Sequence, residues 1–367
     1  MVVLLFSIFI SLAYVWWARL VFGGWNEFAS MNPSVTAEQD KISIVIAFRN
    51  ESKNLPILLD SLSKLEYQQR NVEIIFVDDK SEDDGPDVIN SWIQTTRLKA
   101  RLLSSADSGK KAAQNLGIEA AQFSIVACTD ADCELPCTWL KRINEAFINP
   151  KTELVFGSVE LKGSNNNLQR MEFLALIGST VGMLQQGWAV MGNAANMAFR
   201  KATYMAAFAS LDAKKSVSGD DVFLLHEVAK KPNAVNVLPG ADSVVKTFPQ
   251  SSFNALLSQR IRWASKAKLY VSRKAIAVAF LVFLANTLLL CLLFGMFFQI
   301  TYAISFIPLV FVKLTSDYVL LKAFSKYYKH EFSLKIFLLQ EVLNLIYIPS
   351  VAILSQLQGF KWKGRKY

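Results

Sequence analysis

The stretch that decides the fold is Ser124 to Glu134, SIVACTDADCE, a short apolar run that ends in two aspartates, Asp130 and Asp132. Ile125 to Cys128 has the composition of a buried strand, and the carboxylates follow where this strand leaves its sheet. Ligands of open α/β sheets bind in the crevice outside the carboxyl ends of the strands. Two hard oxygen ligands at that place suit Mg²⁺ or Mn²⁺ carrying a diphosphate.

A second interpretation of the same stretch is purely structural. Asp130 and Asp132 are residue types that begin turns and cap helices, and Pro136 is typical of the first turn of a helix. The stretch by itself leaves both interpretations open, so the rest of the chain has to decide between them.

Strands and helices alternate on both sides of this stretch. Ile42 to Ala47 and Glu73 to Asp79 are continuous apolar runs, as expected for strands covered on both faces, and Leu98 to Leu103 is a weaker one. Further along the chain, Glu153 to Glu160 is expected to form one more strand. Leucines at helical spacing follow the first run, and a helix is expected from about Lys110 to Ala121. The pattern predicts an α/β fold with a parallel sheet and one functional edge. The Gly-x-Gly-x-x-Gly and Walker signatures are both missing, which argues against dinucleotide-binding and P-loop proteins.

The composition indicates a membrane protein with an inserted water-soluble domain. Of 367 residues, 52% are hydrophobic, and this excess is concentrated before Phe22 and after Ala275. The formal net charge is +9, but the basic residues flank the apolar segments rather than forming a stripe. Such flanks fit anionic lipid headgroups and cytoplasmic retention better than nucleic acid. The four cysteines form no Cys-x-x-Cys pair, so a zinc site is not expected.

The sequence predicts six segments. They are an N-terminal transmembrane anchor (1–22), a linker (23–40), a cytosolic catalytic domain (41–250), an amphipathic interfacial helix (251–274), C-terminal membrane segments (275–357) and a basic tail (358–367). Within the C-terminal part, Ile276 to Phe298 and Gln299 to Leu321 are expected to cross the membrane. Glu331 to Leu354 carries Glu341 and is expected to lie in the interface or to re-enter.

Two further groups of polar residues lie after the predicted sheet. Asp220 and Asp221 follow Gly219 at the start of a helical pattern, where helix capping explains one aspartate better than it explains the pair. Gln259 lies on the amphipathic segment Phe253 to Tyr270, whose surface position does not by itself require a glutamine, an arginine and a tryptophan close together.

The order of these motifs resembles the membrane-bound family 2 inverting glycosyltransferases, the branch that includes ceramide glucosyltransferase and the cellulose and hyaluronan synthases. The resemblance runs from about Lys41 to Trp263. It rests on the ordered set IVIAFRNE, VDDKSEDD, GKKAAQNLG, TDAD, SGDD and QRIRW. It implies a GT-A fold, which is an α/β nucleotide-diphospho-sugar transferase domain, here with N-terminal and C-terminal transmembrane helices.

The resemblance also implies roles for individual residues. Asp79 would contact the nucleotide base, with Glu51 and Ala47 on the same rim and Lys110 near the nucleotide. Asp132, helped by Asp130, would hold Mg²⁺ or Mn²⁺ on the diphosphate.

The later motifs would act on the acceptor and the leaving group. Asp221 would be the general base, while Gln259, Arg262 and Trp263 match the QxxRW signature beside the diphosphate and acceptor. Two departures stand out: Ala47 replaces a common Pro, and Gly-Asp-Asp replaces the Thr-Glu-Asp of polymer synthases, which argues against polymerisation.

These features together predict transfer of a sugar, UDP-linked, from a nucleotide-sugar donor to a lipid or glycan acceptor at the cytosolic face of a bacterial inner membrane. The alternatives are a processive polysaccharide synthase and a non-catalytic nucleotide-sugar-binding scaffold. No nucleic-acid partner is expected. In the tail, Trp362 and Arg365 resemble the Trp-x-x-Arg segment that covers the donor site in hyaluronan synthases, which implies a gating role. The alternative is that the tail binds anionic headgroups.

Overall fold

The chain forms two compact units, each built from segments that are far apart in the sequence. The structure, a computed structural model, describes residues 1–31, 38–163, 168–210, 220–269, 272–357, 361–362 and 365–366. One unit contains Ala29–Lys162 and Met191–Phe248, and the other contains Met1–Phe28, Gly163–Val190 and Pro249–Tyr367.

The first of these units is built on a seven-stranded sheet. Its strands are β1 (Ile42–Phe48), β2 (Val72–Asp78), β3 (Lys99–Ser104), β4 (Ile125–Cys128), β5 (Leu154–Phe156), β7 (Met197–Arg200) and β8 (Val235–Val237). Their order is β3-β2-β1-β4-β7-β5-β8, and β7 runs antiparallel to both of its neighbours. Strands β1 to β4 are parallel, so their carboxyl ends lie at one edge. The predicted parallel sheet is therefore confirmed in this half.

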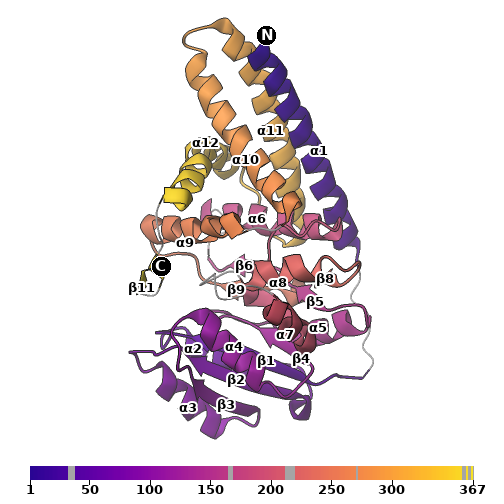
Figure 1. Cartoon of the computed structure of the whole chain (residues 1–367), viewed down its shortest axis with the longest axis vertical. Helices are drawn as coiled ribbons and strands as arrows, with labels where there is room; N and C mark the ends of the chain where they lie inside the picture. The colour runs from indigo at the N-terminus through magenta and orange to yellow at the C-terminus, as the bar shows by residue number, and fades with distance from the viewer. Residues whose placement is uncertain are drawn as a thin grey trace. The chain divides into compact units, whose positions relative to one another are not determined.

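Helices and a small second sheet complete this unit (Figure 1). The helices are α2 (Leu55–Ser63), α3 (Gly85–Thr95), α4 (Lys110–Ala120), α5 (Trp139–Phe147), α7 (Lys201–Ser210) and α8 (Asp220–Val228). Strands β6 (Val159–Leu161) and β9 (Val245–Thr247) pair in parallel. Helix α4 packs closely on the sheet at Gly117, because a Cβ there would lie 2.5 Å from Val45 Cγ1.

The other unit consists of helices and a terminal hairpin. The helices are α1 (Val2–Ser30), α6 (Leu168–Gln185), α9 (Phe253–Ser265), α10 (Arg273–Gly295), α11 (Ile300–Tyr327) and α12 (Leu334–Leu357). Strands β10 (Lys361–Trp362) and β11 (Arg365–Lys366) pair antiparallel, with Trp362 opposite Arg365. In Figure 1, α1, α10 and α11 run together, whereas the axis of α12 diverges from theirs.

Among the described residues, α1, α10, α11 and α12 are long and apolar enough to cross a membrane. Their outward faces keep large apolar side chains uncovered by protein, such as Phe9 on α1 and Val342 on α12, each 64% exposed. An apolar surface of this kind suits lipid rather than water. The interfacial or re-entrant course predicted for 331–354 stays a prediction, because length and composition also allow α12 to cross.

Close helix contacts hold this unit together. Gly24 of α1 meets Gly182 of α6 backbone to backbone, since a Cβ at Gly24 would lie 2.0 Å from the Gly182 carbonyl oxygen. The ring of Trp25 lies 4.5 Å from that of Phe324 on α11. Small residues at such crossings let helices approach closely where lipid supplies no hydrophobic drive.

A charged cluster lies between α1, α11 and α12. Lys313 donates to Asp317 at 2.8 Å and pairs with Glu341, and the Tyr14 hydroxyl donates to Asp317 at 2.9 Å. We refer to these four residues as the helix cluster. Lys313 is 3% exposed, so the charges that interrupt the apolar pattern of α11 face protein.

Three boundaries differ from those expected from the sequence. Helix α1 continues past Phe22 to Ser30, so the first part of the expected linker is helical. The run 153–160 is two strands, β5 and β6, rather than one. Residues 163–190 group with the apolar helices, so 41–250 is not one uninterrupted unit. The reason is packing, because α6 buries an apolar face that includes Phe173, Leu174 and Ile177.

Candidate active site

The predicted donor-site residues follow the parallel strands β1, β2 and β4 at the sheet edge where these strands end. Ala47 is the one partly exposed residue of β1, and Glu51 comes three residues after that strand ends. Asp79 follows β2, and Asp130 comes two residues after β4. The sheet therefore brings together the side chains that the sequence assigned to one rim.

Arg49 fixes the loops that leave β1 and β2. Its guanidinium is buried, and Nη1 donates to the carbonyl oxygens of Asp79 and Lys80 at 2.9 and 2.7 Å. Its Nη2 donates to Glu82 at 2.8 Å. The sequence motif included Arg49 without giving it a role, because its acceptors are carbonyls about thirty positions away.

Asp79 is almost fully buried, and it organises the next loop. It is 1% exposed, and its Oδ1 accepts from the Gly109 N–H at 2.8 Å. Gly109 has φ of 119°, a conformation that strains any residue with a Cβ. Asp79 thereby fixes the turn from which α4 and Lys110 begin. Asp79 therefore has a structural role in addition to its predicted contact with the nucleotide base.

Lys110 extends the chain of contacts to the aspartates after β4. Its Nζ forms an ion pair with Asp130 Oδ1, and both side chains are about one-third exposed. Hydrogen bonds therefore link the ends of β2 and β4 through the start of α4, in the order Asp79, Gly109, Lys110 and Asp130. We refer to these four residues as the edge relay.

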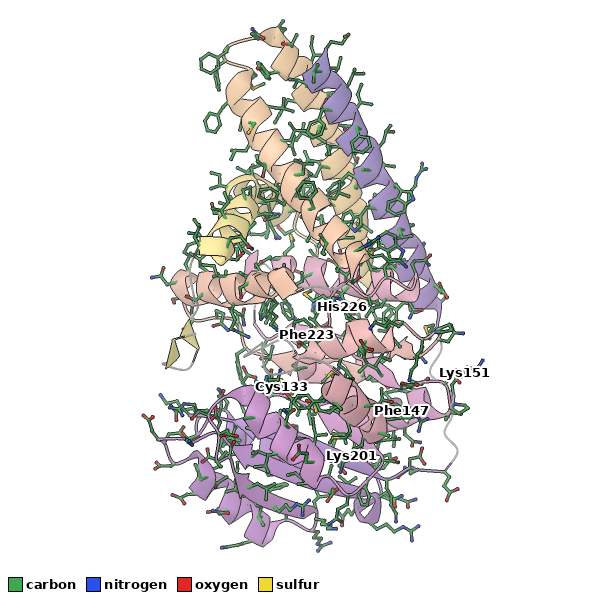
Figure 2. The ribbon with its side chains drawn as sticks, in the orientation of Figure 1. Cys133, Phe147, Lys151, Lys201, Phe223 and His226 are labelled. Carbon is green, nitrogen blue, oxygen red and sulfur yellow. The ribbon has the colours of Figure 1, made fainter. Side chains whose placement is uncertain are left out.

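The Asp130–Asp132 turn exposes its carboxylates and buries the residues around them. Asp130 and Asp132 are partly exposed, whereas Ala131 and Cys133 are buried. The Cys133 N–H donates to the Asp130 carbonyl at 3.2 Å. Burial, together with the nearby Asp132 and Asp130 carboxylates, raises the pKa of the Cys133 thiol, which is labelled in Figure 2. Cys133 is therefore an apolar neighbour of the carboxylates at neutral pH.

The two aspartates have the chemistry for a divalent cation. Among the described residues, no group of three or more His, Cys, Asp or Glu side chains can hold a metal ion. Mg²⁺ in phosphate-transfer sites is commonly held by one or two carboxylates, with water and substrate phosphates completing its ligands. Partly exposed Asp130 and Asp132 fit that smaller set, with Asp130 balanced by Lys110 before any ligand binds.

Asp221 lies in the first turn of α8, the helix that carries Phe223 and His226 in Figure 2. It is partly exposed, and its Oδ1 accepts from the Val222 N–H at 2.9 Å. A Cβ at Gly192 would lie 3.4 Å from the Asp221 carbonyl oxygen, so the glycine-rich turn before β7 packs beside it. The side chain of Asp220 and residues 216–219 lie outside the described residues.

Asn196, at the start of β7, is a buried residue that sequence reasoning missed. Its Nδ2 donates to the carbonyls of Ser158 and Ser243, each at 2.9 Å, and its Oδ1 accepts from Trp139 Nε1 at 2.9 Å. Asn196 therefore ties together the start of α5, the link between β5 and β6, and the turn before β9. Its residue type gives no signal, since all three partners are remote in sequence.

The QxxRW residues lie on α9 in the other unit. Gln259, Arg262 and Trp263 are each partly exposed. The structure joins Gln259 and Trp263 through Arg260, which lies within 2.5 Å of Gln259 Oε1 and 4.4 Å from the Trp263 ring. Sequence reasoning counted Arg260 only among the basic residues beside the apolar segments, whereas the structure buries it.

Comparison with known proteins identifies the family of the region that carries most of the sheet. Residues 43–208 match the family model "Glycosyl transferase family 2". The chain carries a family 2 glycosyltransferase domain. This match covers the sheet up to β7, the edge relay and both aspartates after β4, whereas β8, α8 and α9 lie outside it. The resemblance read from the motifs is thereby confirmed.

Curated relatives of this glycosyltransferase domain are synthases of glycans and glycolipids. A poly-beta-1,6-N-acetyl-D-glucosamine synthase of Staphylococcus epidermidis is 30% identical over 141 residues, which are 37% of this chain and 34% of that protein. A beta-monoglucosyldiacylglycerol synthase of Synechocystis is 28% identical over 129 residues, which are 35% of this chain and 26% of that protein. The chain thus matches about a third or less of each relative's length.

A solved structure shares the fold over nearly the whole chain. The mannosyltransferase of Pyrobaculum calidifontis, in complex with GDP-Man and Mn²⁺, aligns with a TM-score of 0.60 over 96% of this chain and 99% of that one. The identity is 15%, so the alignment speaks for the fold alone. It confirms the GT-A fold expected from the sequence.

Proposed function

We propose that the chain transfers a sugar from a UDP-linked donor to a lipid or lipid-linked acceptor, with inversion at the anomeric carbon. The observation that carries this proposal is the edge relay, which gathers Asp79, Lys110 and Asp130 beside Asp132 at the carboxyl ends of the strands. Nucleotide ligands of α/β sheets bind at that edge. The family match supports glycosyl transfer as the reaction.

Asp132 and Asp130 are proposed to hold Mg²⁺ or Mn²⁺. When bound, the cation supplies positive charge that offsets the charge developing on the departing diphosphate. Lys110 is proposed to contribute a second positive charge. Its ion pair with Asp130 is partly solvated and therefore weak, so Asp130 can bind the metal ion in place of the Lys110 ammonium group. Asp79, held by Gly109, and Glu51 are proposed to line the nucleotide side of the same edge.

Asp221 is proposed as the general base. Inversion requires a base on the acceptor hydroxyl, on the side opposite the leaving group, so a carboxylate separate from the metal-binding pair is needed. Asp221 opens α8, apart in the chain from the β4 turn, and its carboxylate is partly exposed. The acceptor proton would pass to the Asp221 carboxylate.

The α9 residues are proposed to serve the diphosphate and the acceptor. Arg262 offers a planar fork that suits phosphate oxygens, and Trp263 offers a flat face on which a sugar ring can stack. Gln259 offers an amide to the same ligands. These roles rest on the motif, and the partial exposure of all three side chains agrees with them.

The four candidate membrane spans and the name of the monoglucosyldiacylglycerol synthase support a lipid acceptor. A processive synthase is the second candidate, favoured by the name of the poly-beta-1,6-N-acetyl-D-glucosamine synthase. Basic residues beside the apolar segments favour a cytosolic domain at a bacterial inner membrane.

Transfer assays on the full chain in lipid nanodiscs test the proposal. Wild type is incubated with Mn²⁺, a panel of UDP-sugars and GDP-mannose, and lipid acceptors, and product size is read by mass spectrometry. We expect one UDP-sugar to yield a single-sugar glycolipid of inverted anomeric configuration. Asp221→Asn should bind donor but not turn it over, with Asp220→Asn as the matched active control. A long polymer, or no transfer from any donor, overturns the proposal.

A further inference from the structure

Arg260 lies within the Gln-Arg-Ile-Arg-Trp motif at a position to which the motif assigns no role. Unlike its neighbours Gln259 and Arg262, it is buried, with 7% of its surface exposed. A buried guanidinium is costly unless its donors are paired, so its partners reveal what it does.

Glu172 of α6 supplies the balancing charge. Arg260 Nε donates to Glu172 Oε1 at 2.8 Å, and Nη2 donates to Oε2 at 3.0 Å. Two parallel hydrogen bonds between planar groups fix orientation as well as distance. The pair therefore sets the rotation of the guanidinium relative to α6.

The rest of the Arg260 guanidinium contacts two residues of the motif, Gln259 and Trp263. Nη1 donates to Gln259 Oε1 at 2.5 Å, which directs the Gln259 NH₂ group away from Arg260. The guanidinium carbon lies 4.4 Å from the centre of the Trp263 ring, a cation–π contact. The same ring lies 6.3 Å from that of Phe173, the residue after Glu172.

We infer that Arg260, oriented by Glu172, is a positioning residue that presents the Gln259 amide and the Trp263 ring for donor and acceptor. The inference rests on the proposed function and adds a specific assignment to it. The Arg260 side chain contacts both Gln259 and Trp263, and Glu172 on α6 fixes its orientation. Misplacement of such groups by about 1 Å can cost about 100-fold in rate, so a residue that only positions can have a large effect on turnover.

A charge reversal separates positioning from a merely structural link between α6 and α9. In the double variant Arg260→Glu/Glu172→Arg, the ion pair is kept, while the guanidinium moves to the α6 end and the donor to Gln259 Oε1 is lost. We expect the thermal midpoint to return close to that of wild type, whereas kcat stays about tenfold or more lower. Recovery of kcat together with the midpoint would overturn the inference.

Arg260→Lys is the second variant, in case the reversal does not fold. Lysine keeps the charge but cannot form the bidentate fork and also reach Gln259. We expect a loss of kcat of about tenfold with little change in donor KM, and no further loss when the change is made in Gln259→Ala/Trp263→Ala. Full kcat in Arg260→Lys overturns the inference. Arg273→Met, which removes an exposed charge at the start of α10, is the control and should match wild type.

A readout without turnover keeps this test separate from that of the proposed function. The emission of Trp263 is taken as the difference between each protein and its Trp263→Phe counterpart. We expect Arg260→Lys to shift this difference spectrum and Arg273→Met to leave it unchanged. If wild type transfers no sugar, the proposed function fails while the spectrum still tests the positioning of Trp263. An unshifted spectrum in Arg260→Lys overturns the inference.

Discussion

Two lysines of this chain make the same kind of ion pair in opposite surroundings. Lys110 of the edge relay pairs with Asp130, and 36% and 32% of their side chains are exposed. Lys313 of the helix cluster pairs with Asp317 and Glu341, and the three side chains are 3%, 14% and 8% exposed. A solvated pair contributes about 0–1 kcal/mol, whereas removing one partner of a buried pair costs about 3–5 kcal/mol.

This difference in solvent exposure suits the two ion-pair clusters to different roles. The solvated ion pair of the edge relay is weak enough to open without unfolding the domain, which fits the proposed binding of a cation by Asp130 and of a diphosphate by Lys110. In the helix cluster the charges compensate one another among apolar helices, so they hold α1, α11 and α12 in register.

The largest effect on stability is expected from Lys313→Met. The change leaves the carboxylates of Asp317 and Glu341 buried without their cation, so the free energy of unfolding should fall by about 3–5 kcal/mol. Thermal unfolding in one detergent gives the measurement. Lys326→Met, which removes an exposed lysine of the same helix, is the matched control. The triple variant Lys313→Met/Asp317→Asn/Glu341→Gln should recover most of the lost stability. If Lys313→Met and the triple variant lost equal stability, unpaired buried charge would not be the cause.

Sequence reasoning located the sheet and the edge proposed to carry the active site because both follow from local patterns. The strands β1, β2 and β4 are continuous apolar runs, and Asp79, Asp130 and Asp132 come directly after them in the chain. A carboxylate after a buried strand needs no knowledge of the tertiary structure to be noticed.

The features that the sequence did not reveal depend on partners remote in the chain. The run 153–160 breaks at Gly157 because a Cβ there would lie 2.1 Å from Asn196 Nδ2. Helix α1 continues to Ser30 because its last turns pack on α6 and α11, with Trp25 against Phe324. Arg260 was missed for the same reason, since Glu172 lies 88 positions away.

A smaller effect on stability is expected from Lys110→Met. The ion pair with Asp130 is about one-third exposed, so its loss should change the free energy of unfolding by no more than about 1 kcal/mol. The rate of sugar transfer should nevertheless fall by about tenfold or more, because Lys110 is proposed to offset charge on the diphosphate. Denaturant titration and initial rates measured on one preparation give both numbers. A large loss of stability with unchanged rates would reverse the roles of the two sites.

The smallest effect is expected at Asp83, a carboxylate of the loop after β2. Partial burial opposes its ionisation, but N–H donors from Ser52 at 2.8 Å and Gly85 at 3.1 Å outweigh burial and lower its pKa. A lowered pKa stabilises the fold above the unfolded value near pH ~3.9, and this stabilisation is lost as pH falls through the folded pKa. The stability gap between wild type and Asp83→Asn should therefore be present at pH 7 and shrink in acid. A gap that widens in acid would contradict this sign.

The most direct test of the account compares the rate of sugar transfer in three proteins. They are wild type, Asp132→Asn and the triple helix-cluster variant. Both variants are assayed in the same nanodiscs with the same donor, and folding is checked beforehand by the thermal midpoint. Asp132→Asn should lose about 1000-fold or more in rate, because it removes a ligand of the proposed metal site, while the triple variant should stay within about threefold of wild type. Full activity of Asp132→Asn in excess chelator, or loss of activity in a folded triple variant, would contradict the division of duties between the edge relay and the helix cluster.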